Sequence, residues 1–387
     1  MIPYAKQSIS REDIKAVTEV LKRDFITRGP VVKEFEEEIS SYCGSKFAVA
    51  FNSATSGLIA ACYAGEVTPN DRLITSPNTF IGTVAGGYYK GAEPVFVDID
   101  HLTGNIDLDL LKFSSEYTSS RGKNVYIPVH FSGIPVDMKK VEGMITDPNS
   151  IIVEDAAHAL GSRYSDGSKV GSCKWSDMTV FSFHPAKNIT SGEGGVVTTN
   201  SEHLYRLLCQ FRDNGIVRDP KYFIGQNSAC YYEVQDVTGN YHMTDIHAAL
   251  GLSQFKRLDL FGNKRRELVQ LYRELLKDEE SIQFLEVDNH DDVMYHLCVV
   301  LIDFGSLGLT KSEVMVSLKE QGVGTQVHYI PLYRHPFFTK GHRQVDQYFP
   351  EMEKYYDRCL SLPLYYDLTE KDVKKVVKTL KKVLQNC

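Results

Sequence analysis

The chain has 387 residues, of which 42% are hydrophobic and 24% are charged. This length has room for two packed domains, and this composition excludes a disordered chain, a collagen and a coiled-coil array. The 43 Lys and Arg residues stand against 50 Asp and Glu residues, which gives a net charge of −7. We therefore expect no broad basic surface that would collect nucleic acid or an anionic membrane.

The sequence also lacks the signals of export and of metal binding. Residues 1–13 carry charges and a proline where a secretory signal needs an apolar run, and no stretch approaches the about 20 apolar residues of a membrane span. We expect a cytoplasmic protein. The eight cysteines form no CxxC pair, so we expect mostly buried, reduced thiols, and the histidines lack the spacing of metal ligands.

Before about residue 255, short apolar runs alternate with stretches that are long enough for helices. These runs are residues 47–51, 73–75, 95–97, 125–129, 151–153, 178–183 and 196–199. Continuous apolar runs are typical of strands that are buried on both faces, and the intervening stretches can form crossover helices. We predict a large α/β domain in residues 1–257, built on a mostly parallel sheet.

After about residue 257 the pattern predicts a smaller α+β domain, residues 258–387. Its predicted elements are a helix through 268–276, a strand at 296–302, a helix capped by Thr310 and Glu313, a strand at 325–328 and a last helix after Thr369. The last helix has an apolar face of Val373, Val376, Val377, Leu380 and Leu384. Near the other end of the chain, Ser10 and Asp13 can cap a first helix, for which we predict an inner face of Ile14, Val17 and Leu21.

Lys187 lies in a polar, glycine-rich loop that follows the predicted buried strand at 178–183. A lysine at the end of a core strand either reaches solvent or has a lowered pKa and a chemical role, such as the formation of a Schiff base. Its position alone does not decide between these two interpretations.

Asp155 ends another apolar strand and is followed by small residues up to Gly161. Ligands bind at the carboxyl ends of strands in α/β sheets, so Asp155 and Lys187 are candidates for one pocket. A lysine for a Schiff base and a carboxylate for a pyridinium nitrogen are the pair that pyridoxal phosphate (PLP) chemistry needs. Taken singly, Asp155 can be a helix cap and His158 an ordinary hydrogen-bonded polar residue.

A third strand end completes a possible cofactor site. Residues 52–57 follow the strand at 47–51 and precede a predicted helix, so their amides and hydroxyls point to a helix N-terminus, where a phosphate binds well. The same small hydroxyl residues are also ordinary helix caps.

Further motifs lie between the first helix and the last quarter of the chain. Together with the segments above they are residues 27–30, 52–57, 76–80, 129–133 with Asp137, 154–161, 181–195, 212–215, 239–245, 327–331 and 361–363. In these motifs the chain resembles the pyridoxal-phosphate sugar aminotransferases, which make amino sugars on nucleotide diphosphates. The resemblance implies an aspartate-aminotransferase-like fold (PLP fold type I), with a seven-stranded, mostly parallel sheet in the large domain and a smaller C-terminal α+β domain.

The resemblance also implies a role for each matching residue. Lys187 matches the Schiff-base lysine, and Asp155 the partner of the pyridinium nitrogen. The other cofactor residues implied are Phe80 stacked on the ring, His158 beside the ring hydroxyl, Thr55, Ser56 and Ser182 on the phosphate, and Asn240 on the phosphate of the neighbouring subunit. The implied assembly is a homodimer with shared active sites, and we expect an isolated monomer to be inactive.

These implied roles agree with the chemistry of PLP-dependent transamination. Formation of an imine needs a neutral lysine amine, and a ring nitrogen kept protonated by Asp155 lets the ring take up the electrons of a departing Cα proton. Lys187, once displaced by the amino donor, can carry that proton as general base and acid.

The presence of Lys187 favours transamination, because a dehydratase branch of the family has histidine at this position. The residues around Lys187 and the stretch 47–60 look most like the branch that aminates carbon 4 of a UDP-linked 4-keto-6-deoxy-N-acetylhexosamine in pseudaminic acid biosynthesis. By resemblance the amino donor is L-glutamate and the by-product is 2-oxoglutarate. Close relatives aminate other UDP- or dTDP-4-keto sugars with nearly the same cofactor residues, so this alternative stays open.

Other interpretations also stay open at this point. Family members often have Gly-Thr where this chain has Ala54-Thr55, and His-Gly where it has Asn214-Gly215. His328 and Tyr329, with Thr27 from the turn at 27–30, are candidate substrate-binding residues, although the first two can equally be packing residues. The rival functions are a PLP-dependent sugar dehydratase or lyase and a non-catalytic sensor of sugar nucleotides.

Overall fold

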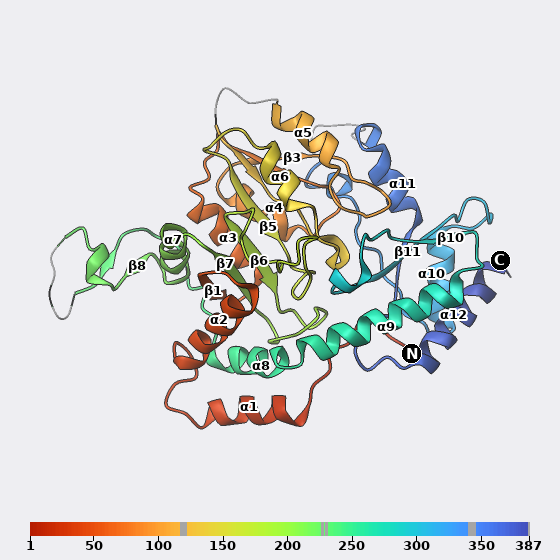
Figure 1. The fold of residues 1–387 in the computed structure, drawn as a ribbon, viewed down its shortest axis with the longest axis horizontal. Helices are drawn as coiled ribbons and strands as arrows, with labels where there is room; N and C mark the ends of the chain where they lie inside the picture. Colours follow the sequence, from red (N-terminus) through yellow and green to blue (C-terminus); the bar gives the residue numbers. More distant parts are fainter. Residues whose placement is uncertain (117–121, 226–227, 229–230, 340–345, 386–387) are drawn as a thin grey trace.

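A seven-stranded sheet forms the centre of the computed structural model, which describes residues 1–116, 122–225, 228, 231–339 and 346–385 (Figure 1). The strand order is β1-β7-β6-β5-β4-β2-β3. The bounds are β1 Phe47–Phe51, β2 Arg72–Thr75, β3 Glu93–Phe96, β4 Asn124–Tyr126, β5 Ile151–Asp155, β6 Met178–Ser182 and β7 Gly195–Thr199. Only β7 runs antiparallel to its neighbours β1 and β6, so the predicted mostly parallel sheet is confirmed.

Both faces of this sheet are buried, which explains the continuous apolar runs in the sequence. Along β1, Val49 and Phe51 pack into one apolar cluster, and Ala48 and Ala50 pack into another on the opposite face. The helices of this part are α2 Pro30–Cys43, α3 Ala54–Ala64, α4 Gly82–Tyr89, α5 Leu108–Glu116, α6 Met138–Met144, α7 Glu202–Arg212 and α8 Asp245–Phe255. Helix α3 contacts both α4 and α7, and all three contribute to the cluster that holds Val49.

A three-stranded antiparallel sheet forms the centre of the smaller part. Its order is β10-β11-β12, with bounds Ile282–Phe284, Cys298–Ile302 and Cys359–Leu362. The helices here are α9 Leu258–Leu276, α10 Lys311–Glu320, α11 Pro350–Arg358 and α12 Glu370–Gln385. Helix α9 runs from the large sheet to the small one (Figure 1), and the five residues predicted for the inner face of α12 are all buried.

A short two-stranded ribbon, β8 Ile216–Val217 and β9 Glu233–Val234, extends from the large sheet (Figure 1). The 3₁₀ turns are Phe131–Gly133, Pro220–Tyr222, His290–Asp292, Leu332–Arg334 and Asp346–Tyr348. Six cysteines in the described residues have free thiols, whereas Cys230 and Cys387 lie outside them. No helix among the described residues is both long and apolar enough to cross a membrane.

Two local predictions are wrong. Residues 325–328 form no strand: they lie along the free edge of β12, where only Gln326 makes an isolated bridge, to Ser361. In helix α1 (Arg11–Leu21), Ile14 and Leu21 are exposed instead of buried. The expected boundary between residues 257 and 258 falls between α8 and α9 and stays a prediction.

The buried face of α1 contains a carboxylate instead of Ile14. Asp13 is fully buried, and its Oδ2 accepts hydrogen bonds from Gln254 (2.7 Å) and Arg257 (2.5 Å). The side chains of Ser10 and Asp13 also form a capping box at the start of the helix. Burial opposes ionisation of Asp13, but these hydrogen bonds and the Arg257 charge outweigh it, so the pKa of Asp13 lies below its ordinary value of 3.8.

We predict that Asp13→Ala lowers the free energy of unfolding by about 2–4 kcal/mol, because it removes a cap and leaves the Arg257 guanidinium without its partner. The folded-state pKa is lowered, so this stabilisation is complete above pH 3.8 and is lost as the pH falls through the folded-state pKa. Urea unfolding at neutral and acid pH measures both effects. The matched control is Glu19→Gln on the same helix, whose exposed ion pair with Lys22 should contribute nothing measurable. Equal loss in both variants would contradict the role of Asp13.

Candidate active site

The ends of four strands meet at one edge of the large sheet. In the register of the sheet, Phe51 at the end of β1 lies opposite Gly195, and Gly195 lies opposite Ser182 at the end of β6. Because β7 is antiparallel to both neighbours, its first residue lies beside their last residues. Asp155 ends β5, which is the next strand in the sheet. The strand ends selected from the sequence therefore do share one edge.

Helix α3 begins directly after β1 at this edge. Ser53 caps the helix, and its Oγ accepts a hydrogen bond from the amide of Ser56 (3.1 Å). Gly195 allows the start of α3 to approach strand β7 closely, since a Cβ on Gly195 would lie 2.5 Å from the Ala54 nitrogen. Thr55 and Ser56 thus lie at a helix N-terminus beside the end of β6, an arrangement that fits a phosphate group.

Asp155 is a buried carboxylate that has only neutral hydrogen-bond donors. Its Oδ2 accepts a hydrogen bond from the Thr83 hydroxyl (2.7 Å), and its Oδ1 accepts one from the Ala157 amide (3.1 Å). The Thr83 hydroxyl is itself 2.6 Å from that of Thr79. Within the described residues Asp155 makes no ion pair. A buried carboxylate without a cationic partner fits a group that brings an N–H⁺, as a protonated pyridine ring does.

The neighbouring Glu154 points to the opposite face of β5 and forms a separate buried network. It accepts hydrogen bonds from His130 (2.7 Å), Thr179 (2.8 Å), Tyr164 and Ser176. Burial alone would raise the pKa of Glu154, but the hydrogen bonds and His130 outweigh it and lower that pKa. This network holds the end of β5, and therefore Asp155, in place.

Lys187 lies half-buried in the loop after β6, where its amide donates to the His184 carbonyl (2.8 Å). Burial lowers the pKa of Lys187 from 10.5 to about 8, and the negative charge of Asp155 partly opposes this shift. The interpretation of a lysine with a lowered pKa, which the sequence left open, is therefore the one that the structure supports. At such a pKa about one tenth of the amine is neutral at pH 7, far more than for a lysine with its ordinary pKa.

His158 lies behind this lysine, and its ring is fully hydrogen-bonded. Its Nδ1 accepts the Ser132 amide proton (3.2 Å), and its Nε2 lies 3.1 Å from the Tyr329 hydroxyl. Burial, the positive charge of Lys187 and His328 hold the pKa of His158 well below 6.5. Burial and Lys187 likewise lower the pKa of His328 to about 3. Both imidazoles are therefore neutral in this site.

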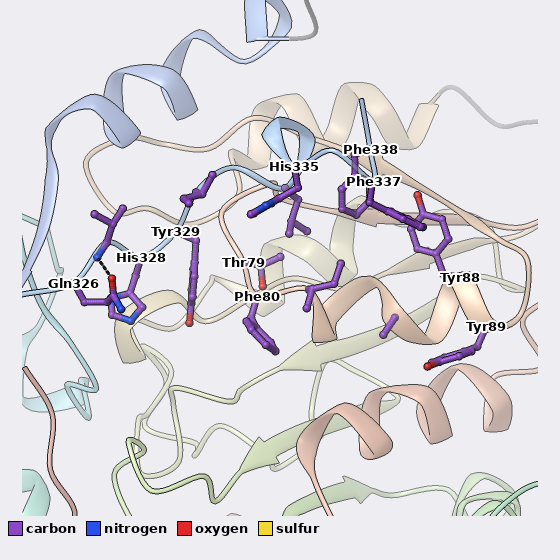
Figure 2. A pocket seen from close by; sticks show the side chains of 15 residues that line it. Thr79, Phe80, Tyr88, Tyr89, Gln326, His328, Tyr329, His335, Phe337 and Phe338 are labelled. Carbon is purple, nitrogen blue, oxygen red and sulfur yellow. Dashed lines mark hydrogen bonds between the residues drawn. The ribbon is translucent and has the colours of Figure 1, made fainter. Parts of the chain in front are cut away.

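A cavity of about 910 Å³ lies beside these residues (Figure 2). Three of the sequence candidates, Phe80, His328 and Tyr329, line it. Phe80 exposes 59% of its side chain, an unusual state for a phenylalanine that has no ligand or partner against it. The other end of the cavity is aromatic, with Tyr88 and Tyr89 from α4 and Phe337 and Phe338.

Thr27 and Asn240 lie apart from this cavity. Thr27 is exposed and pairs with Thr244, so the structure does not bring it to the other substrate candidates in the same chain. Asn240 is also exposed, but the next residue, Tyr241, accepts the amide proton of Asn52 (2.9 Å). Asn240 therefore stands near the start of the phosphate-type site, on its solvent side.

Sequence reasoning missed the residues that support the candidates. Thr83 on α4 orients Asp155, and its hydroxyl also contacts that of Thr79, which precedes the helix. Ser132 and His296, which contact His158, carry no local signal. The roles assigned to the candidate residues stay predictions.

The family model described as the DegT/DnrJ/EryC1/StrS aminotransferase family matches residues 7–381. The chain belongs to this family. It is therefore an aminotransferase by family, and the resemblance in its motifs is confirmed.

Two curated relatives span nearly the whole chain. The spore coat polysaccharide biosynthesis protein SpsC of Bacillus subtilis is 36% identical over 99% of this chain and 97% of its own. The UDP-4-amino-4,6-dideoxy-N-acetyl-beta-L-altrosamine transaminase of Campylobacter jejuni is 33% identical over 100% of this chain and 98% of its own.

Solved structures agree with the fold. Helicobacter pylori PseC, an aminotransferase of pseudaminic acid biosynthesis, has a TM-score of 0.89 at 29% identity and covers 100% of both chains. A putative sugar aminotransferase of Streptococcus pneumoniae in its PLP form has a TM-score of 0.87 at 28% identity, over 99% of this chain and 98% of that chain. The predicted fold is confirmed, and the family together with this PLP form indicates PLP as the cofactor.

We predict that the amine of Lys187 in cofactor-free protein titrates with an apparent pKa of about 8, because burial destabilises its ammonium form. Its rate of reaction with an amine-directed reagent should rise with pH and level off above about 8. Mass spectrometry of the peptide that contains Lys187 measures this rate, and the exposed Lys46 in the same digest reports the pH dependence of the reagent. In Asp155→Asn the midpoint should move lower still, since the Asp155 charge raises the pKa. A midpoint near 10.5 would show that the amine is fully hydrated.

Proposed function

We propose that this aminotransferase uses PLP and L-glutamate to aminate carbon 4 of a nucleotide-linked 4-keto-6-deoxy sugar. The proposed acceptor is UDP-2-acetamido-2,6-dideoxy-beta-L-arabino-hexos-4-ulose, and the products are the 4-amino sugar and 2-oxoglutarate. The observation that carries the proposal is the position of Lys187, with its lowered pKa, near the buried carboxylate of Asp155, whose hydrogen-bond donors among the described residues are neutral.

Each residue has a distinct part in this proposal. When bound, PLP supplies an electron-accepting ring that stabilises the negative charge left after a Cα proton is removed. Lys187 takes and returns that proton at its Nζ, which a pKa of about 8 allows in both directions. Asp155 holds a proton on the ring nitrogen, and Thr83 keeps the carboxylate directed to it. Phe80 stacks on the ring, while Thr55, Ser56 and Ser182 bind the phosphate.

Two names support this acceptor: the Helicobacter structure is named for pseudaminic acid biosynthesis, and the Campylobacter relative is named as the transaminase of a UDP-linked 4-amino-4,6-dideoxy-N-acetyl sugar. The Bacillus relative, which is named for spore coat polysaccharide, is at least as similar to this chain. For this reason another UDP- or dTDP-4-keto sugar is the second candidate acceptor. His328 and Tyr329 are the proposed contacts of the acceptor, because they line the cavity beside Phe80.

A PLP-dependent dehydratase or lyase and a non-catalytic sensor are the rivals from other classes. The dehydratase branch replaces the lysine by histidine, and this chain keeps Lys187. A sensor needs no amine with a lowered pKa. We further propose that the protein acts in the cytoplasm.

The absorption spectrum of the purified protein tests both half-reactions. We expect a yellow protein that loses its visible band with L-glutamate and regains it with the UDP-4-keto sugar. Loss without recovery would reject this acceptor and keep the aminotransferase. Ammonia release without consumption of glutamate would favour the dehydratase, and no visible band after addition of PLP would contradict the role of Lys187.

Two variants separate the roles of the key residues. Lys187→Ala should abolish both half-reactions, because the group that carries the proton is gone. Asp155→Asn should still bind PLP but lower kcat by about 10²–10³-fold, as expected when charge stabilisation in an active site is removed. Full turnover by Lys187→Ala would overturn the mechanism.

We also propose a homodimer in which Asn240 of one subunit completes the phosphate site of the other. Asn240 is exposed. In the segment before the turn at 27–30, several large apolar residues are exposed. Their exposed fractions are 60% for Ile14, 57% for Leu21, 60% for Phe25 and 48% for Ile26. Soluble monomers rarely expose large apolar patches, so these residues support a covered surface.

Mixed dimers test whether the sites are shared. We expect Lys187→Ala and Asn240→Asp each to be inactive alone, the second because its carboxylate repels the phosphate. After the two are mixed and allowed to exchange subunits, sharing predicts the return of activity to about one quarter of the wild-type value, since half of the dimers then carry one intact site. If each subunit supplied its own Asn240, no activity would return. Size-exclusion chromatography with light scattering establishes the dimer independently.

A further inference from the structure

Ser132 connects His158 to the small-domain segment that precedes β11. It lies in the 3₁₀ turn Phe131–Gly133 with a φ of +59°, a left-handed conformation that is uncommon for a residue other than glycine. Its amide donates to Nδ1 of His158 (3.2 Å), and its carbonyl accepts the amide proton of His296 (2.9 Å). Its hydroxyl donates to the carbonyl of Leu297 (3.0 Å). The unusual backbone conformation thus serves two directed hydrogen bonds at once.

His296 packs its ring against that of His158. The ring centroids are 4.4 Å apart with an angle of 43° between the planes, and His296 exposes only 5% of its surface. The carbonyl of His296 accepts a hydrogen bond from Arg265 of α9 (3.2 Å). Arg265 is buried and also donates to the carbonyls of Tyr295 and Leu364. The segment that carries His296 is therefore fixed from behind by a cation.

These contacts determine which nitrogen of His158 carries a proton. An amide is only a donor, so Nδ1 of His158 must be unprotonated, and the proton of the neutral ring lies on Nε2. Nε2–H then donates to the Tyr329 hydroxyl (3.1 Å) at the cavity.

The charged and titratable groups around the imidazole rings of His158 and His296 keep both rings neutral. His158 faces Lys187, His328, Tyr329 and His296. His296 faces His158, Lys187, Arg265 and His328, and these groups together with burial lower its pKa well below 6.5. Protonation of either ring would add a buried positive charge beside existing ones.

We propose that Ser132 and His296 are positioning residues for His158, which hold its ring in one orientation and in the Nε2–H tautomer. The importance of this tautomer for catalysis rests on the proposed function, in which His158 lies beside the ring hydroxyl of PLP. The tautomer itself is a property of the cofactor-free protein. It is tested there, so failure of the cofactor proposal and failure of this inference are distinguishable.

The test is ¹⁵N NMR of cofactor-free protein labelled at histidine, with His158 assigned by its loss in His158→Gln. In wild-type protein we expect an unprotonated Nδ1 and a protonated Nε2 that do not titrate between pH 5 and 8. His296→Ala should give a mixture of tautomers, and His296→Phe should restore the single tautomer, because a phenyl ring can refill the space beside His158. His290→Ala, in the same segment but away from Lys187, is the matched control and should leave the tautomer unchanged.

A second pair of variants addresses the backbone of Ser132. Ser132→Gly keeps the amide and tolerates a φ of +59°, so the tautomer should persist. Ser132→Val disfavours this φ and should yield both tautomers. In turnover assays, His296→Ala and Ser132→Val should lower kcat about tenfold, a loss typical of removing a residue that orients a functional histidine. The KM for L-glutamate should change less than about twofold. A single Nε2–H tautomer in both His296→Ala and Ser132→Val would overturn the inference, and so would a protonated Nδ1 in the wild type.

Discussion

The burial of an amine and a carboxylate at the same edge of one sheet is the constraint on which the rest of the site depends. Taking charges out of water is costly, so each group needs a specific compensation. Asp155 receives it from the neutral donors Thr83 and Ala157. In the part of the chain that the structure describes, no carboxylate is hydrogen-bonded to the Lys187 amine, and the pKa of Lys187 falls to about 8 instead. The chemistry that we propose uses the lowered pKa of Lys187, since an amine that gives up its proton easily can also take one from a substrate.

The fold brings these groups together through the topology of the sheet. The antiparallel strand β7 places Gly195 between the ends of β1 and β6. Since this glycine has no side chain, the start of α3 approaches the sheet closely enough for Thr55 and Ser56 to lie near Ser182. Behind the sheet edge, the network of Glu154 fixes β5 from the other face. Strand ends and a helix start therefore fix Asp155, Ser182, Thr55 and Ser56, whereas Lys187 is carried by the loop that follows β6.

What the sequence predicts well is what is encoded locally. The continuous apolar runs identify the strands because burial on both faces leaves no alternation, and Asp155 stands out as a charged residue at the end of such a run. Thr83, Ser132 and His296 act across large sequence separations, so no local pattern assigns their supporting roles. The error in α1 has the same origin. Amphipathic spacing favours Ile14 as the inner residue, but Gln254 and Arg257 from distant segments bind Asp13 and turn its face inward instead.

The type of reaction is easier to assign than the substrate, because the cofactor candidates and the cavity wall belong to different segments of the chain. The cofactor candidates belong to the large sheet and the loops at its edge, whereas most of the cavity wall is formed by residues 79–89 and 326–338. Changes in that wall alter the space for an acceptor without moving Lys187 or Asp155. Relatives at 36% and 33% identity are named for spore coat polysaccharide biosynthesis and for an altrosamine transaminase, so the family resemblance alone does not select the acceptor. His158 and Tyr329 stand where the two regions meet, because a hydrogen bond joins them across the boundary. A change in the cavity wall that moved Tyr329 would therefore also disturb His158 beside the proposed cofactor site. For this reason Ser132 and His296, which contact His158, need to hold it rigidly.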